Sequence, residues 1–160
     1  MLIYTHAFDK QHASYRLLLL FNSLDGSLIS EQIRIFDFML AFPSFLQGVR
    51  KTRRVKIRSA MNKYEFAGSF QQCFFLMEQP QISSLLELVS RKLIIKDGPF
   101  FKRNNKYRAI FDKISLIEQT SEQMEALGLI VNMLNDIEVR GKNGLKNRAN
   151  LMESIYDPSD

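Results

Sequence analysis

Two consecutive segments that are apolar on nearly every face constrain the fold of this chain more than any other feature. The spacing of apolar residues predicts helices over Lys10–Leu24 and Ser30–Phe42, with Ser30 as the N-cap of the second. Asp25-Gly26 ends the first helix and Pro43 ends the second. A surface helix needs only one apolar stripe, whereas a helix that is apolar all round must be covered on every side. We therefore expect both helices at the centre of the core.

The length and composition of the chain indicate one folded domain. A chain of 160 residues is long enough to bury a core of its own. Its 46% hydrophobic and 24% charged residues exclude the disordered and collagen-like classes. The longest apolar runs, Leu17–Phe21 and Phe38–Phe42, are far shorter than the roughly 20 residues that cross a bilayer. Met1–His6 has no signal-peptide pattern, and the single cysteine, Cys73, suits a reducing compartment, so we expect a cytoplasmic protein.

The rest of the first 118 residues predicts more helices and a small β-hairpin. A short extended segment is expected near Ile3–Phe8, and helices are expected over Ser44–Val49, Phe66–Glu78 and Gln81–Arg91. Leu93-Ile94-Ile95 has the pattern of a strand, and Tyr107–Ile110 has that of the strand returning across a turn-rich segment. Two helices followed by a basic hairpin are the outline of a winged helix. The alternative is a generic helical domain capped by a hairpin.

The C-terminal part predicts a helical extension. Thr120 and Gln123 form a capping box at the start of a long helix. The apolar stripe of this helix comprises Met124, Leu127, Val131 and Leu134. The stripe either packs on the chain's own domain or docks a partner helix. We expect a single, mostly α, winged-helix-like domain over residues 1–160, with core and wing over 1–118 and the extension over 119–160.

Basic residues are segregated along the chain, although the formal net charge is only +5. The segments Val49–Lys63, Arg91–Arg108 and Arg140–Arg148 hold 18 of the 22 Lys and Arg residues, with Asp97 as their one acid. The stretch Asp112–Glu138 is predominantly acidic. Such segregation indicates oriented contact with an anionic partner, and solvated loops are the alternative.

The candidate contacts to DNA or to a protein partner are the basic residues of these segments. They are Arg50, Lys51, Arg53, Arg54, Lys56, Arg58, Lys102, Arg103, Lys106, Arg108, Lys142, Lys146 and Arg148. Phe100-Phe101 lies beside this set and would either stack on bases or anchor the hairpin to its own core.

Signals for catalysis, metal binding and cofactor binding are weak. His6 and His12 are the only histidines, and with Cys73 they match no spacing typical of a zinc site. Cys73 lies on an apolar helical face, where a cysteine is usually a small core residue. No glycine-rich phosphate loop is present. We therefore expect a non-enzymatic protein with no metal and no cofactor.

Three parts of the sequence, taken in order, resemble the middle-component proteins of bacterial ABC three-component systems. These parts are Tyr15–Leu20 with Glu31–Pro43, Lys63–Phe66 with Gln81–Ile94, and Gly144–Asp157. The most specific blocks are EQIRIFDFMLAFP and GLKNRANLMESIYD. The resemblance implies a small winged-helix protein that works beside an SMC-like ABC ATPase and an effector in defence systems related to Lamassu.

The function implied by this resemblance is that of a non-catalytic adaptor that links the ATPase, the effector and double-stranded DNA. The alternative from another class is an autonomous winged-helix transcriptional regulator. Its recognition helix would be Gln81–Arg91, which offers several polar side chains but only Arg91 as a cation. Because Arg and Lys dominate contacts in the major groove, this helix is poorly suited to reading bases.

Overall fold

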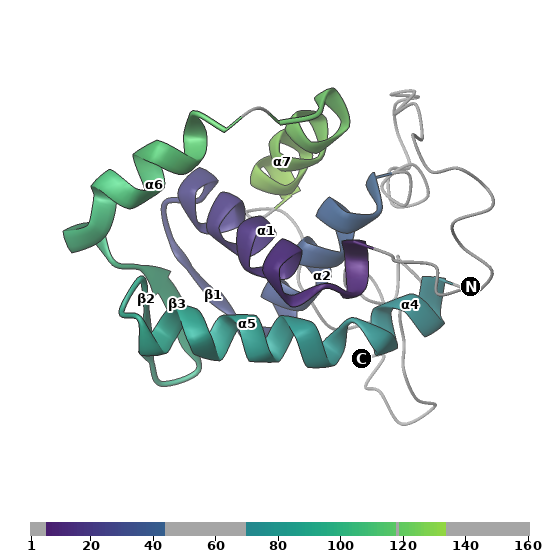
Figure 1. Cartoon of the computed structure of the whole chain (residues 1–160), viewed down its shortest axis with the longest axis horizontal. Coiled ribbons are helices and arrows are strands. Elements are labelled where there is room, and N and C mark those ends of the chain that lie inside the picture. Colours follow the sequence, from purple (N-terminus) through teal and green to yellow (C-terminus); the bar gives the residue numbers. More distant parts are fainter. Residues whose placement is uncertain (1–5, 44–69, 118, 134–160) are drawn as a thin grey trace.

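The computed structural model describes residues 6–43, 70–117 and 119–133, which form a helical body with one small sheet (Figure 1). A 3₁₀ turn, η1 (His6–Phe8), and helix α1 (Lys10–Ser23) come first. Strand β1 (Ser27–Ile29) then leads into helix α2 (Ser30–Ala41).

The second part of the chain supplies a helix pair, a hairpin and two more helices. Helices α4 (Phe70–Leu76) and α5 (Glu78–Ser90) are followed by strands β2 (Ile94–Asp97) and β3 (Phe100–Arg103). The last described elements are the 3₁₀ turn η3 (Asn105–Tyr107) and helices α6 (Arg108–Ser115) and α7 (Ser121–Met133). Among the described helices, none combines the length and apolar character needed to cross a bilayer.

Helices α1 and α2 lie at the centre of the core, as their apolar faces predict. Helix α1 contacts α5 on one side, α6 and α7 on another, and α2 behind it (Figure 1). Leu17 and Leu20 of α1 and Phe38 of α2 have no exposed surface. The Phe38 ring meets the Phe74 ring of α4 edge to face, with centroids 5.5 Å apart. Phe74 is itself fully buried, so this contact joins α4 to the core.

The boundaries of the central helices follow local chemistry. Asp9 caps α1 because its Oδ1 accepts hydrogen bonds from the backbone N–H groups of Gln11 and His12, at 2.8 and 3.0 Å. At α2 the predicted cap is wrong by one residue: Ile29 is the N-cap, and Ser30 is the first helical residue. The Gln32 side chain closes the start of the helix by accepting the N–H of Ile29 at 3.0 Å.

The three-stranded sheet differs from the predicted hairpin in two ways. Its antiparallel order is β1-β3-β2, and β1 pairs with β3 through Leu28 and Phe101. Strand β1 is not predictable from the sequence, because a three-residue strand is too short to show alternation. The predicted returning strand, Tyr107–Ile110, is wrong, since those residues end η3 and begin α6. The strand returns earlier because Gly98, at φ 57°, and Pro99 make a tight two-residue turn.

A buried polar cluster joins the central helices to their neighbours. The guanidinium of Arg16 donates to both carboxylate oxygens of Asp37, at 2.7 and 3.1 Å. It also donates to the backbone carbonyls of His6 and Ala7, both at 3.3 Å. The side-chain amide of Gln81 donates to Asp37 at 2.9 Å. Because Arg16, Asp37 and Gln81 are at most 4% exposed, this cluster fixes η1, α1, α2 and α5 relative to one another.

Replacing Asp37 alone should destabilise the protein severely. Asp37→Ala leaves the Arg16 charge buried without its counter-ion, which costs about 3–5 kcal/mol of the free energy of unfolding. The double substitution Arg16→Met with Asp37→Leu removes both charges and should cost less than Asp37→Ala. Urea unfolding measures both. The control is Arg91→Ala, which breaks the exposed pair with Glu87 and should hardly move the midpoint. A double variant less stable than Asp37→Ala would contradict the argument.

Cys73 is a core residue, as predicted, with no exposed surface. Burial raises the pKa of its thiol to about 12, so the folded protein holds the unreactive thiol form. An unfolded thiol ionises near pH 8.5. The stability due to this difference is therefore fully present below about pH 8.5 and is lost as the pH rises towards 12.

Cys73 should therefore react with iodoacetamide only when the chain opens. At pH 8 the native protein should be labelled at least tenfold more slowly than the urea-unfolded protein. The folded core shields Cys73 from the reagent and keeps its thiol protonated. Mass spectrometry of timed samples measures the two rates. Equal rates would show that Cys73 is not held in the core.

Candidate partner and nucleic-acid interface

Three of the predicted basic contact residues lie exposed on and after the hairpin. Lys102 is on β3, Lys106 is in η3, and Arg108 begins α6. Lys96 of β2 is also exposed and adds to this group. We call these four residues the basic hairpin surface. It places positive charge on consecutive elements, and Arg108 is its one residue with the paired donors that can read a base edge.

Arg103 differs from its neighbours because its side chain is bound within the protein. It donates to the backbone carbonyl and the side-chain oxygen of Asn22 at 3.2 and 3.3 Å, and to the carboxylate of Asp25 at 3.2 Å. Its guanidinium also lies 5.8 Å from the centre of the Phe111 ring. The Arg103 side chain is only 16% exposed. A contact role for Arg103 remains a prediction, but its charge already ties β3 to the end of α1.

The other predicted contact residues lie outside the part of the chain that the structure describes. They are Arg50, Lys51, Arg53, Arg54, Lys56, Arg58, Lys142, Lys146 and Arg148. The predicted helix over Ser44–Val49 and the first four residues of the predicted helix Phe66–Glu78 also lie outside it.

The two aromatic residues of the hairpin have different environments. Phe101 is 6% exposed and packs in the core opposite Leu28 of β1, so it anchors the hairpin, which is one of the two predicted roles. Phe100 is 47% exposed beside the turn. Of the pair, only Phe100 is therefore available to an outside partner.

Helices α4 and α5 expose apolar side chains along one line. The backbone continues across Met77, whose N–H donates to Cys73 and whose carbonyl accepts from Gln81. A regular helix therefore places Phe75, Gln79, Ile82 and Leu86 on one face. Phe75 is 62% exposed and Leu86 is 56% exposed. We call these four residues the α4–α5 stripe.

Two of the polar side chains expected on the recognition helix are buried in the core. Gln81 is buried against Asp37, and Ser84 donates its hydroxyl to the Lys10 carbonyl of α1 at 2.9 Å. Helical spacing in the sequence does not distinguish Gln81 and Ser84 from polar residues that are exposed on the same helix. The outward face of α5 is consequently more apolar than the sequence suggested.

Helix α7 begins with its predicted capping box and exposes part of its apolar stripe. The predicted capping box is confirmed: Thr120 Oγ1 accepts the Gln123 N–H at 3.2 Å, and Gln123 Oε1 accepts the Thr120 N–H at 3.4 Å. Leu127 is buried in the core, whereas Met124 is 61% exposed and Val131 is 38% exposed. Leu134 lies outside the described residues.

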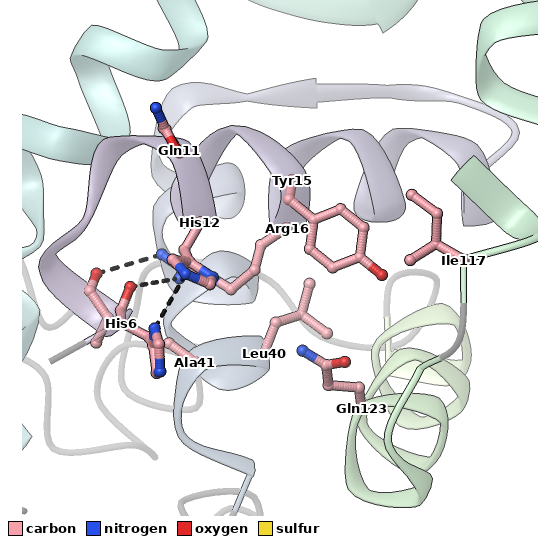
Figure 2. A pocket seen from close by; sticks show the side chains of 10 residues that line it. His6, Gln11, His12, Tyr15, Arg16, Leu40, Ala41, Ile117 and Gln123 are labelled. Carbon is pink, nitrogen blue, oxygen red and sulfur yellow. Dashed lines mark hydrogen bonds between the residues drawn. The ribbon is translucent and has the colours of Figure 1, made fainter. Parts of the chain in front are cut away.

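A pocket of about 500 Å³ lies between α1, the end of α2 and the start of α7. Figure 2 shows the imidazoles of His6 and His12 at one side of it and the Tyr15 hydroxyl at the other. His6 Nδ1 and His12 Nε2 share a hydrogen bond of 3.0 Å. Burial raises the pKa of Tyr15, so its hydroxyl stays protonated. The sequence does not indicate this pocket, because it forms only where Tyr15, Ile117 and Gln123 come together in the fold.

Metal ligands do not gather in the described residues. No three His, Cys, Asp or Glu side chains within those residues are placed to hold one ion. Cys73 is buried away from the imidazoles, in the core cluster around Phe38 and Phe74.

Neutral substitutions at Lys102 and Arg103 should differ in their effect on stability. Arg103→Gln removes bonds to Asn22 and Asp25 and should lower the free energy of unfolding by about 1–2 kcal/mol. Lys102→Gln should change it by less than about 0.5 kcal/mol. Urea unfolding of the two variants measures the difference. If both variants unfold like the original chain, Arg103 is not the anchor of the hairpin.

Comparison with known families identifies the chain at the level of its family. The family model described as ABC-three component (ABC-3C) system Middle Component 5 matches residues 2–157. The chain therefore belongs to this family, which confirms the resemblance found in its sequence. No curated protein and no solved structure matches the chain.

Proposed function

We propose that this middle component is a non-catalytic, cytoplasmic adaptor in a Lamassu-like defence complex, which links an SMC-like ABC ATPase to an effector and to DNA. Membership of a three-component family implies protein partners. ATP hydrolysis and the effector chemistry would then belong to those partners.

The described elements support a winged-helix interpretation of the fold. Helix α1, strand β1, helices α2 and α5, and the hairpin β2–β3 follow one another in that order, with α4 before α5. The strand order β1-β3-β2 places the hairpin beside β1. In this interpretation α2 and α5 are the helix-turn-helix pair, and the hairpin is the wing.

The exposed face of α5 favours protein contact over base reading. If α5 lay in the major groove to read DNA, the exposed side chains of Ile82 and Leu86 would face the bases. Most base contacts are made by cations and amides, so these apolar side chains are poorly suited to that role. Large exposed apolar side chains in a line are typical of surfaces that bind another protein. This observation carries the adaptor proposal and disfavours the autonomous regulator.

The basic hairpin surface supplies the proposed contact with DNA. Its side chains are exposed, and they lie on other elements than the α4–α5 stripe. Lysines spread over a strand and a turn neutralise phosphates without selecting a sequence, so binding by this surface should be weak and non-specific. Several such contacts act together once the complex is assembled.

Two sets of substitutions should separate the protein contact from the DNA contact. Phe75→Ser with Leu86→Ser should abolish co-purification with the ATPase component, because the stripe loses its apolar anchors. Lys102→Gln, Lys106→Gln and Arg108→Gln together should leave co-purification intact. In the assembled complex this triple variant should lower the slope of log affinity for duplex DNA against log salt by about two to three units. Co-purification and fluorescence anisotropy measure the two effects.

The same measurements identify the competing functions. A stable homodimer that binds one DNA sequence tightly and ignores the ATPase would replace the adaptor with a transcriptional regulator. Unchanged DNA affinity and salt slope in the triple variant would reassign the basic hairpin surface to protein contact. Thermal unfolding of each variant provides the control that the fold is intact.

A further inference from the structure

The hairpin turns one aromatic ring, that of Phe100, towards solvent. Side chains alternate between the two faces of a strand, and Phe101 packs in the core, so Phe100 lies on the outer face of the sheet. Phe100 is 47% exposed, and within the described part of the chain it contacts no other ring and no cation. Covering this ring with a ligand is favourable, because apolar surface leaves water.

Lys102 supplies an uncompensated positive charge on the same face. It is the next outward residue of β3, about 7 Å along the strand from Phe100. Its side chain is exposed, and among the described residues its ammonium has no hydrogen bond and no ion pair. Arg103 differs, because its charge is matched by Asp25. Lys102 is therefore the cation of this face that is available to a phosphate.

A polar pocket of about 310 Å³ lies at the Lys102 end of the face. It is formed between the turn that joins α1 to β1 and the end of β3, and Ser27 and Asn105 line it together with Lys102. Ser27 is also the residue that pairs with Lys102 in the sheet. Hydroxyl and amide groups donate hydrogen bonds to phosphate and sugar oxygens, so the pocket complements the charge of Lys102.

This arrangement suits an unpaired base better than a duplex. In a duplex each base is enclosed by the bases stacked above and below it, so a ring on a sheet face has no base surface to contact. In a single strand the bases stack on exposed aromatic rings while the phosphates follow the cations. Asp97 pairs with Phe100 and repels phosphate there, which favours the Lys102 end for the backbone.

We propose that the outer face of the sheet binds single-stranded DNA, with one base stacked on the Phe100 ring and a neighbouring phosphate held by Lys102 at the polar pocket. This inference rests on the DNA contact of the proposed function, and it names an unpaired strand as the form of DNA that the hairpin prefers. Figure 1 shows the hairpin at the end of α5 that is remote from α4, so the bound strand leaves α4 uncovered.

Fluorescence anisotropy of the full chain tests the preference with three probes of about 20 nucleotides, which is longer than one such module covers. The probes are oligothymidylate, a duplex of the same length, and an abasic strand with the same phosphates. Oligothymidylate should bind at least about fivefold more tightly than either of the others. Charge alone would favour the duplex over the single strand, because the duplex has the higher charge density.

Phe100→Leu removes the ring while keeping an apolar side chain. It should weaken the binding of oligothymidylate at least about fivefold and change duplex affinity by less than about twofold. Phe75→Leu is the matched control, since Phe75 is an exposed phenylalanine on α4. It should leave both affinities unchanged.

A fluorescent residue at the same position gives a second measurement. The chain contains no tryptophan, so Phe100→Trp introduces its only indole. Oligothymidylate should quench the fluorescence of this variant, because the base stacks on the indole, whereas the abasic strand should not. Phe75→Trp, the corresponding control, should be quenched by neither strand.

Three outcomes overturn the inference. Equal binding of the abasic strand and oligothymidylate would show that charge alone holds the strand. Equal loss of duplex and single-strand affinity in Phe100→Leu would show that the ring inserts into a duplex. In both of these cases the proposed DNA contact stands. If neither single strand nor duplex binds the chain or its assembled complex, the proposed DNA contact fails together with this inference.

Discussion

The buried carboxylate of Asp37 is the point at which the fold is held together. Apolar contacts alone bring α1 and α2 into one core, but they are non-directional and would allow the helices to slide. The paired hydrogen bonds from Arg16 and the amide of Gln81 set one arrangement of three helices. Because Arg16 also binds two carbonyls of η1, the same carboxylate positions the histidines beside the pocket.

The parts of the fold that the sequence predicts are those encoded by long, regular patterns. The two central helices, the core position of Cys73 and the capping box at Thr120 all follow from spacing and local hydrogen bonding. Strand β1 could not be predicted, since its pairing partner Phe101 is distant in the chain. The end of the hairpin was misplaced because Tyr107–Ile110 resembles a strand locally, yet the turn at Gly98 determines where the chain returns.

At the candidate sites, the sequence does not predict whether a single side chain is exposed or bound within the protein. Sequence identifies Lys102 and Arg103 as equivalent cations, whereas the tertiary structure exposes one and binds the other to Asn22 and Asp25. Likewise, Gln81 looks like a surface residue of a recognition helix until the position of Asp37 is known. Such roles depend on contacts between distant segments, which helical spacing does not contain.

The single buried thiol makes this chain convenient for measuring its own assembly. Cys73 is the only cysteine in 160 residues, and it is fully enclosed by the core. A cysteine introduced at an exposed position would therefore be the one accessible thiol, and a spectroscopic probe attached there would report from that position alone. Distances between such a probe and a labelled partner would give the geometry of a complex without first removing any native residue.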